Sequence, residues 1–243
     1  MRHRAALLTG ATITGVMLCS QSPATPPNGN DGEKPFDLMP LAEAKELTEL
    51  ADTIIPLTED DFVEVARRLG VEVAAIKAIV DIEAGRTHEG FSAPGKPLIN
   101  FDLTMFRRFA TKRGVNLAKY TKSHPAVFNS HRGSQTLANL RLDAAKTINR
   151  HAAIEGTFWG MFQIGGFNWK KCGAESIDDF EARMSRSERD QLDLFAEFIV
   201  NSGLLEPLKT KDWARFARGY NGPSYARRGY HTRMAQAYAR HSK

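Results

Sequence analysis

Apolar residues at helical spacing run through most of the chain and restrict its fold more than any other feature. From about Leu57 onward, successive segments place apolar side chains three or four residues apart, as the buried face of a helix requires. The segments expected to be helical are 58–69, 72–83, 104–110, 134–154, 176–184, 187–202, 211–220 and 232–241. Outside them, residues 98–101 have the pattern of a short strand. The sequence therefore predicts a mainly α domain with a small extended subregion.

Polar residues at the ends of the first segment predict where that helix starts and stops. Thr58 and Asp61 have the spacing of a capping box, in which two side chains satisfy the free amide groups of a helix start. Gly70 follows the last apolar residue, Leu69, and is expected to end the helix.

Composition divides the chain into three predicted parts. Arg2 and Arg4 precede an uncharged apolar stretch, residues 5–18, which is short for a membrane span and typical of an export signal. Residues 1–22 are therefore expected to be a signal peptide. Residues 23–56 are rich in Pro, Gly and Asn at first and are expected to be a flexible tether, with apolar spacing that permits a short helix over 41–55. The folded domain is expected to span residues 57–243.

The two cysteines, Cys19 and Cys172, are too few for a disulfide scaffold or a four-thiolate metal site. Cys19 ends the apolar stretch, where a lipoprotein signal carries the cysteine that becomes acylated. Leu18 departs from the small residue usual before that cysteine, so ordinary cleavage near Ser20 or Ser22 is the alternative. Both predict export to the periplasm or cell envelope, the first with a lipid anchor on Cys19. Cys172 is expected to pack inside the domain.

Basic residues gather near the C-terminus. The chain has a formal charge of +5, yet residues 207–243 alone contain nine Lys or Arg and a single acid, Asp212. These cations are spread along amphipathic helices and no nucleic-acid recognition motif accompanies them, so nucleic acid is not an expected partner. The seven histidines form no His-x-x-x-His pair, and no phosphate-loop or dinucleotide signature is present. No metal or cofactor is therefore expected.

Glu83 stands out because of its place on the helix expected over 72–83. It lies seven residues after Ile76, which puts it about 20° from the direction of that core residue. Burial would raise the pKa of the carboxyl and keep it protonated near neutral pH, as a general acid requires. The alternative is a glutamate at a helix end whose carboxyl reaches water. Asp81 points to the opposite side and is expected to be solvated.

Two further segments combine aromatic residues, glycines and side-chain amides. Residues 158–168 (FWGMFQIGGFN) hold four aromatic residues, three glycines and two amides, which suit the binding of sugar rings, the alternative being a tightly packed core turn. Residues 216–225 (FARGYNGPSY) predict a helix end that breaks into a Gly-Pro turn and presents Tyr220 and Asn221. Taken alone, this second segment is no more than a helix C-cap.

In this order, the three features resemble the sequence pattern of lysozyme-like enzymes that cleave the glycan strands of peptidoglycan, including lytic transglycosylases. The closer resemblance is to the N-acetylmuramidase family of phage-endolysin type, and it runs from about Leu57 to Arg240. The segments that carry it are LTEDDF (57–62), VEVAAIKA (71–78), WGMFQI (159–164), GFN (166–168) and FARGYNGP (216–223). The resemblance implies an α+β, lysozyme-like fold in which the extended subregion flanks a substrate cleft.

The resemblance also implies roles for particular residues. Glu83 would be catalytic, and the substrate-binding residues would be Trp159, Gln163, Phe167, Asn168, Tyr220 and Asn221. The chain departs from the family at Ala84 and Phe158, where serine is common, and at Asp102, where glutamate is common. Asp102 is the best candidate for a second catalytic carboxylate, although it also precedes a predicted helix and has the position of an N-cap.

The activity that the resemblance implies is hydrolysis of the β-1,4 bond between N-acetylmuramic acid and N-acetylglucosamine. A lytic transglycosylase, which needs one glutamate and forms 1,6-anhydro products, is the alternative enzyme. A protein that binds peptidoglycan without cleaving it is the alternative of another class. In each case the expected partner is the peptidoglycan glycan strand. The basic C-terminal residues would face an anionic cell wall. The protein is expected to be a monomer.

Overall fold

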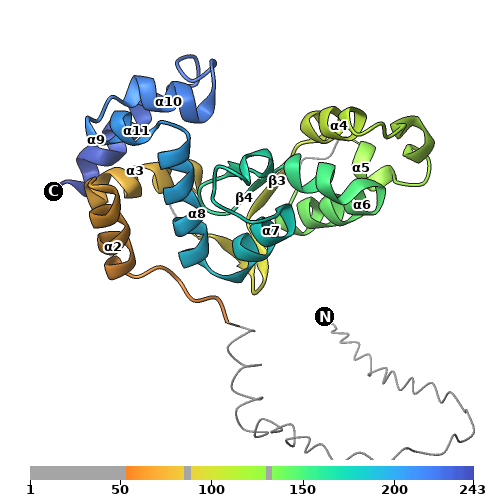
Figure 1. The fold of residues 1–243 in the computed structure, drawn as a ribbon, viewed down its shortest axis with the longest axis horizontal. Coiled ribbons are helices and arrows are strands. Elements are labelled where there is room, and N and C mark those ends of the chain that lie inside the picture. Colours follow the sequence, from red (N-terminus) through yellow and green to blue (C-terminus); the bar gives the residue numbers. More distant parts are fainter. Residues whose placement is uncertain (1–52, 85–88, 130–132) are drawn as a thin grey trace, which may run out of the picture. The chain divides into compact units, whose positions relative to one another are not determined.

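The computed structural model describes residues 53–84, 89–129 and 133–243, all of which belong to one compact unit, Leu41–Lys243 (Figure 1). The predicted signal peptide (1–22), Cys19 and nearly all of the predicted tether lie outside the described residues. Of the short helix expected over 41–55, only residues 53–55 are described, and these are not helical.

The described part of the chain is mainly helical, as predicted. The helices are α2 (Glu59–Leu69), α3 (Val73–Glu83), α4 (Leu103–Lys112), α5 (Pro125–Phe128), α6 (Gln135–Glu155), α7 (Ile177–Arg186), α8 (Glu188–Asn201), α9 (Leu205–Lys209), α10 (Trp213–Asn221) and α11 (Tyr230–His241). Two 3₁₀ segments, Leu117–Tyr120 and Gly166–Asn168, join them. No described helix has both the length and the apolar character needed to cross a membrane.

Side chains at the helix starts explain why the elements begin where they do. Thr58 accepts from the Asp61 amide while Asp61 accepts from the Thr58 amide, so the predicted capping box is confirmed. Gly70 ends α2 in the left-handed conformation, with φ 66°, which glycine adopts without strain. Ser134, Ser176 and Ser187 each accept a hydrogen bond from the first turn of the following helix.

The extended subregion consists of a hairpin and a small antiparallel sheet. The hairpin pairs β1 (Phe91–Ala93) with β2 (Lys96–Pro97), and the sheet has the order β3 (Ile99–Phe101), β4 (Thr157–Trp159), β5 (Ile164–Gly165). The predicted strand at 98–101 is thus confirmed as β3. Its Ile99 and Phe101 are buried, whereas Asn100 between them is exposed. The sheet therefore turns one polar side chain of β3 away from the core.

Helix α3 lies along α11 (Figure 1) and buries most of its apolar residues. Ala75, Ile76, Ile79 and Val80 are each at most 1% exposed. Asp81 is not solvated, contrary to the expectation, because α11 covers it: its carboxylate is 2.9 Å from Arg240 and 3.0 Å from His241. The side of α3 that carries Asp81 is therefore a helix contact closed by an ion pair.

Candidate active site

Glu83 occupies the last position of α3, where the buried face of the helix reaches a cleft. Its Oε1 accepts a hydrogen bond of 2.8 Å from Nδ2 of Asn221, the last residue of α10. Because α3 is anchored by its apolar residues, the carboxyl is held at the end of a core helix and is half-buried. A half-buried acid is thus placed where two helices end.

Burial raises the pKa of Glu83 to about 7. The hydrogen bond from Asn221 and the positive charge of Arg233 act in the opposite direction, because both favour the carboxylate, but they do not offset the loss of solvation. At pH values below 7 the carboxyl therefore keeps its proton and can donate it. This is the state that the position of Glu83 on its helix predicts.

The end of α10 is fixed by Tyr220. Its ring stacks on Phe216 at 5.4 Å between centroids, and its hydroxyl donates to the Phe162 carbonyl oxygen at 2.6 Å. Burial raises the pKa of the Tyr220 phenol, so it stays a hydrogen-bond donor. This contact positions the next residue, Asn221, against Glu83. The Oδ1 atom of Asn221 is buried and has no hydrogen-bond partner among the described residues.

Two cavities meet at Glu83. One has a volume of about 480 Å³ and lies between the end of α3, β3 and the first turns of α6; we call it the α6 cavity. The other, of about 430 Å³, lies between β3 and the end of α10; we call it the α10 cavity. Three residues line both: Glu83, Asn100 and Gln163. Each volume is in the range of about 300–1,000 Å³ that is typical of ligand clefts.

Gln163 sits in the turn between β4 and β5 and borders both cavities. Its φ of 45° is in the left-handed region, which is rare for a residue with a side chain. The turn holds this conformation because the Gln163 amide and its side-chain Nε2 both donate to the Gly160 carbonyl oxygen, at 3.1 and 2.9 Å. Such strain is typical of residues kept for a function.

Asp102 is both a helix N-cap and a residue of the cleft, the two positions that the sequence left open. Its Oδ1 accepts from the Met105 amide at 2.9 Å, so it is the N-cap of α4. It also lines the α10 cavity together with Glu83. The cap fixes the carboxylate in place without removing it from the cleft.

The remaining predicted substrate-binding residues lie elsewhere. Trp159 is 2% exposed and its indole nitrogen donates to the Ile154 carbonyl oxygen at 3.1 Å, so it packs in the core under β4. Phe167 is 39% exposed and stacks on Phe109, and Asn168 ends the adjoining 3₁₀ segment. None of these three is among the described residues that line either cavity. The resemblance implied a sugar-binding cleft near residues 159–168, and contact of these three residues with substrate stays a prediction.

The glycines of residues 158–168 allow close packing as well as the approach of a ligand. A Cβ on Gly166 would lie 2.0 Å from the Ile154 carbonyl oxygen, and one on Gly160 would lie 2.5 Å from the Gln191 side chain. Both are contacts within the core. The alternative interpretation of 158–168 as a packed turn therefore accounts for most of the segment, with Gln163 and Phe158 as the members that reach the cleft.

Sequence reasoning missed several residues that line the cavities. Asn100 is the one polar side chain in an apolar strand, a signal that could have identified it. Arg228 and Tyr230 line the α10 cavity from the loop before α11 and from its first residue, and Arg228 was noticed only as part of a basic segment. Arg141 lines the α6 cavity and reads in the sequence as an ordinary helix cation.

The described residues offer no sign of metal or thiolate chemistry. Within them, no three His, Cys, Asp or Glu side chains are grouped so that they could hold a metal ion. Cys172 is buried, and burial raises the pKa of its thiol to about 12. It packs in the core, as expected, and would remain a thiol at neutral pH.

Comparison with known proteins identifies the family of the chain. The family model of the N-acetylmuramidases matches residues 72–242. The crystal structure of the Burkholderia AP3 phage endolysin is similar to this chain, with a TM-score of 0.65 and 36% identity over 77% of this chain and 71% of the endolysin. No curated protein matches the sequence. Because the family model covers well over half of the chain, the protein belongs to the N-acetylmuramidase family and is a peptidoglycan hydrolase.

Proposed function

We propose that the protein hydrolyses the β-1,4 bond between N-acetylmuramic acid and N-acetylglucosamine, with Glu83 as the general acid. The observation that carries the proposal is the position of a half-buried carboxyl, with its pKa raised to about 7, at the meeting point of two cavities. A glycan strand with one sugar in each cavity would bring its glycosidic oxygen to Glu83.

The hydrogen bond from Asn221 suits both states of the acid. Before bond cleavage, burial keeps the proton on Glu83. When the proton moves to the glycosidic oxygen, the new carboxylate accepts the hydrogen bond from Asn221 Nδ2, which favours the charged form. Asn221 also lines the α10 cavity, where substrate would bind. Asn221 would thus support proton transfer and hold the substrate.

Asp102 would act on the opposite side of the reaction, by stabilising the oxocarbenium-like transition state or by orienting water. Its N-cap hydrogen bond restricts the side chain and keeps a negative charge in the α10 cavity. A matched pair of variants separates charge from capping. Asparagine also caps helices, so Asp102→Asn should keep stability and lose activity, whereas Asp102→Ala should lose both.

A lytic transglycosylase reaction is the second candidate, and one observation favours it. Asp102 Oδ1 is already engaged by the Met105 amide, and transglycosylation needs only one carboxyl group. In that case Glu83 would donate its proton and then act as the base that forms the 1,6-anhydro ring.

Digestion of purified sacculi tests the proposal. The wild-type protein and Glu83→Gln are incubated with sacculi, and the released fragments are reduced and analysed by mass spectrometry. Hydrolysis predicts muramic acid ends that can be reduced, and Glu83→Gln should release almost none while keeping its fold. Anhydro ends would favour the transglycosylase. Retention on sacculi without release by the wild type would indicate a binding protein.

The proposal includes export, because peptidoglycan lies outside the cytoplasmic membrane. The support is the sequence of residues 1–22, with two arginines before an uncharged apolar stretch. Palmitate labelling that is lost in Cys19→Ala would establish a lipid anchor. An unlabelled mature protein that begins after Ser22 would establish ordinary cleavage instead.

A further inference from the structure

The α6 cavity contains a cation that the proposed reaction does not use. Arg141 reaches the cavity from α6, with its guanidinium over the Phe101 ring at 5.0 Å from the centroid. One terminal nitrogen donates to the Val127 carbonyl oxygen at 3.4 Å, a long contact. Its Nε is buried and has no hydrogen-bond partner among the described residues. The guanidinium is therefore held in place, and its other terminal nitrogen has no hydrogen-bond partner among the described residues.

The described residues that line this cavity give it a positive charge. Of the described residues that line it, only Glu83 and Arg141 can ionise, and burial keeps Glu83 protonated up to about pH 7. Asp102 acts on Arg141 electrostatically, but it lines the other cavity. Burial lowers the pKa of Arg141, yet an arginine side chain keeps its charge in proteins. The cavity thus carries a partly buried positive charge that an anion would stabilise.

The other polar side chains of α6 at this cavity are already engaged. The Gln135 amide group both accepts from the Ile99 amide, at 2.9 Å, and donates to the Ile99 carbonyl oxygen, at 3.1 Å. The Ser134 hydroxyl caps the helix. Arg141 is therefore the α6 side chain best able to bind a ligand here.

We propose that Arg141 binds a carboxylate of the muramyl residue and so places that sugar in the α6 cavity. The inference rests on the proposed function. N-acetylmuramic acid differs from N-acetylglucosamine by a lactyl group, whose carboxylate is free in peptide-free strands and carries the acidic stem peptide in intact peptidoglycan. A planar guanidinium can bind a carboxylate through two parallel hydrogen bonds. Arg141 would thus fix the direction in which the strand lies past Glu83.

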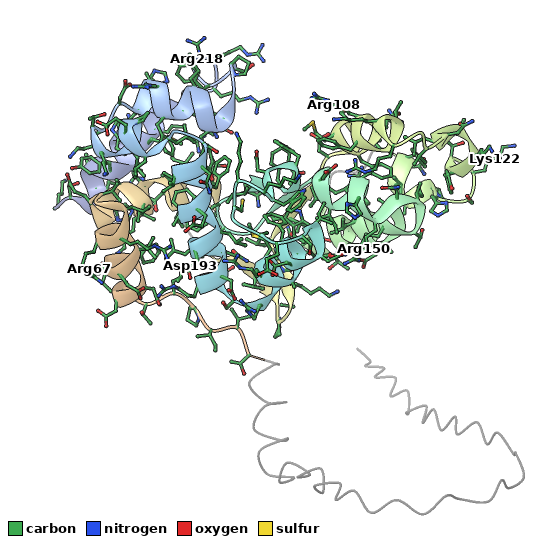
Figure 2. The ribbon with its side chains drawn as sticks, viewed as in Figure 1. Arg67, Arg108, Lys122, Arg150, Asp193 and Arg218 are labelled. Carbon is green, nitrogen blue, oxygen red and sulfur yellow. The ribbon has the colours of Figure 1, made fainter. Side chains whose placement is uncertain are left out.

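A purely structural role for Arg141 predicts a different result, so the test removes each partner separately. The enzyme partner is removed in Arg141→Gln, and Arg141→Lys keeps the charge without the planar group. The substrate partner is removed by converting carboxylates to methylamides with a carbodiimide and methylamine. Arg108→Gln is the matched control, because Arg108 is exposed on the outside of α4 and lines neither cavity (Figure 2).

The expected result is a loss that depends on the substrate carboxylate. Arg141→Gln should lower kcat/KM by at least about tenfold on unmodified strands, mainly through KM, as the loss of one charge-assisted contact predicts. On amidated strands the kcat/KM of Arg141→Gln should equal that of the wild type. Amidation should lower the kcat/KM of the wild type by about the same factor as the Arg141→Gln substitution does on unmodified strands. Arg141→Lys should be intermediate and Arg108→Gln unchanged. A loss on peptide-free strands identifies the lactyl carboxylate, and a loss on intact sacculi alone identifies the stem peptide.

Equal losses on unmodified and amidated strands, or no loss on either, would overturn the inference. If Arg141→Gln melts too low to be assayed, amidation of the wild-type substrate decides, because an unchanged kcat/KM contradicts a carboxylate site. A binding assay distinguishes failure of the Arg141 site from failure of the proposed hydrolysis. Binding of the same strands is measured in Glu83→Gln, with and without Arg141→Gln. Binding that weakens in Glu83→Gln/Arg141→Gln, with no fragment release by the wild type, would reject hydrolysis and support the Arg141 site.

Discussion

The two carboxylic acids at the end of α3 lie two residues apart and have opposite surroundings. Asp81 faces α11, where its carboxylate lies 2.9 Å from Arg240 and 3.0 Å from His241. Glu83 faces the cleft, where its hydrogen-bond partner is the neutral amide of Asn221 at 2.8 Å. One acid closes a helix contact and the other retains a proton for donation.

The difference shows how this fold separates structure from chemistry. Both acids are partly removed from water, since the Asp81 side chain is 9% exposed and Glu83 is half-buried, which raises the pKa of Glu83 to about 7. What differs is the partner that each neighbouring helix supplies. The end of α11 supplies basic side chains, whereas the end of α10 supplies an amide. A charged partner stabilises the carboxylate and lowers its pKa. A neutral partner stabilises it less, so the loss of solvation raises the pKa.

The largest expected effect comes from replacing each acid by its amide. Glu83→Gln should lower kcat by about 100-fold to 10,000-fold, which is the usual contribution of a general acid. Asp81→Asn should leave kcat close to that of the wild type and lower the free energy of unfolding by about 2 kcal/mol, because the contact with Arg240 loses its charge. Fragment release from sacculi and urea unfolding measure the two effects. Comparable losses of activity in both variants would contradict the division between the acids.

The pH dependence of stability should reveal the half-buried acid. Glu83 binds its proton more tightly in the folded chain, where its pKa is about 7, than in the unfolded chain, where it is 4.5. Its contribution to stability is therefore complete below pH 4.5 and is lost as the pH rises to about 7. The loss amounts to about 3 kcal/mol.

The comparison of Glu83→Gln with the wild type isolates this contribution from those of other groups. The free energy of unfolding of the variant, relative to that of the wild type, should increase between pH 4.5 and pH 7 and then stay constant. Urea titrations at several pH values measure it. A difference that does not vary with pH would mean that Glu83 titrates as it does in the unfolded chain.

The sequence predicted the helices better than it predicted the cleft, and the physical reasons differ. Helices with ten or more residues show several apolar periods and polar caps, as α2 does with Thr58 and Gly70. Helices α5 and α9, of four and five residues, and strands β4 and β5 are too short to show a period and were not predicted. Local pattern therefore identifies long elements and misses short ones.

Cleft residues are decided by contacts between distant parts of the chain. The position of Glu83 on its helix indicated the core face but also allowed a carboxyl that reaches water, and its catalytic role was implied only by the family resemblance. Asp81 was expected to be solvated because its partner Arg240 is 159 residues away. Trp159 is of a residue type that stacks on sugar rings, but it is buried in the core. Sequence indicates which face of an element a residue occupies, and the structure determines what covers that face.

A smaller effect should follow from removing the amide beside Glu83. The hydrogen bond from Asn221 lowers the pKa of Glu83, so Asn221→Ala should raise that pKa further. The fall of kcat/KM on the alkaline side should then move to higher pH in this variant, together with a lower maximum because the amide no longer supports the carboxylate formed on proton transfer. A shift to lower pH would show that Asn221 stabilises the protonated form.

The smallest expected effect concerns Arg233, whose charge acts on Glu83 from α11 through space. Arg233→Gln should raise the pKa of Glu83 by less than Asn221→Ala does. Since exposed charges are screened by salt, the difference from the wild type should disappear at high ionic strength. The pH profile of kcat/KM, recorded at low and at high salt, measures it. A shift of the same size at both salt concentrations would contradict a through-space charge effect.

Glu83 holds its proton up to about pH 7, while the other acid at the end of α3 forms an ion pair. A ¹³C NMR titration of the glutamate carboxyl groups measures this directly when the spectra of the wild type and Glu83→Gln are subtracted to assign the signal. The account predicts a single carboxyl with a midpoint near pH 7 that is absent from the variant. A Glu83 midpoint near the ordinary value of 4.5 would contradict it.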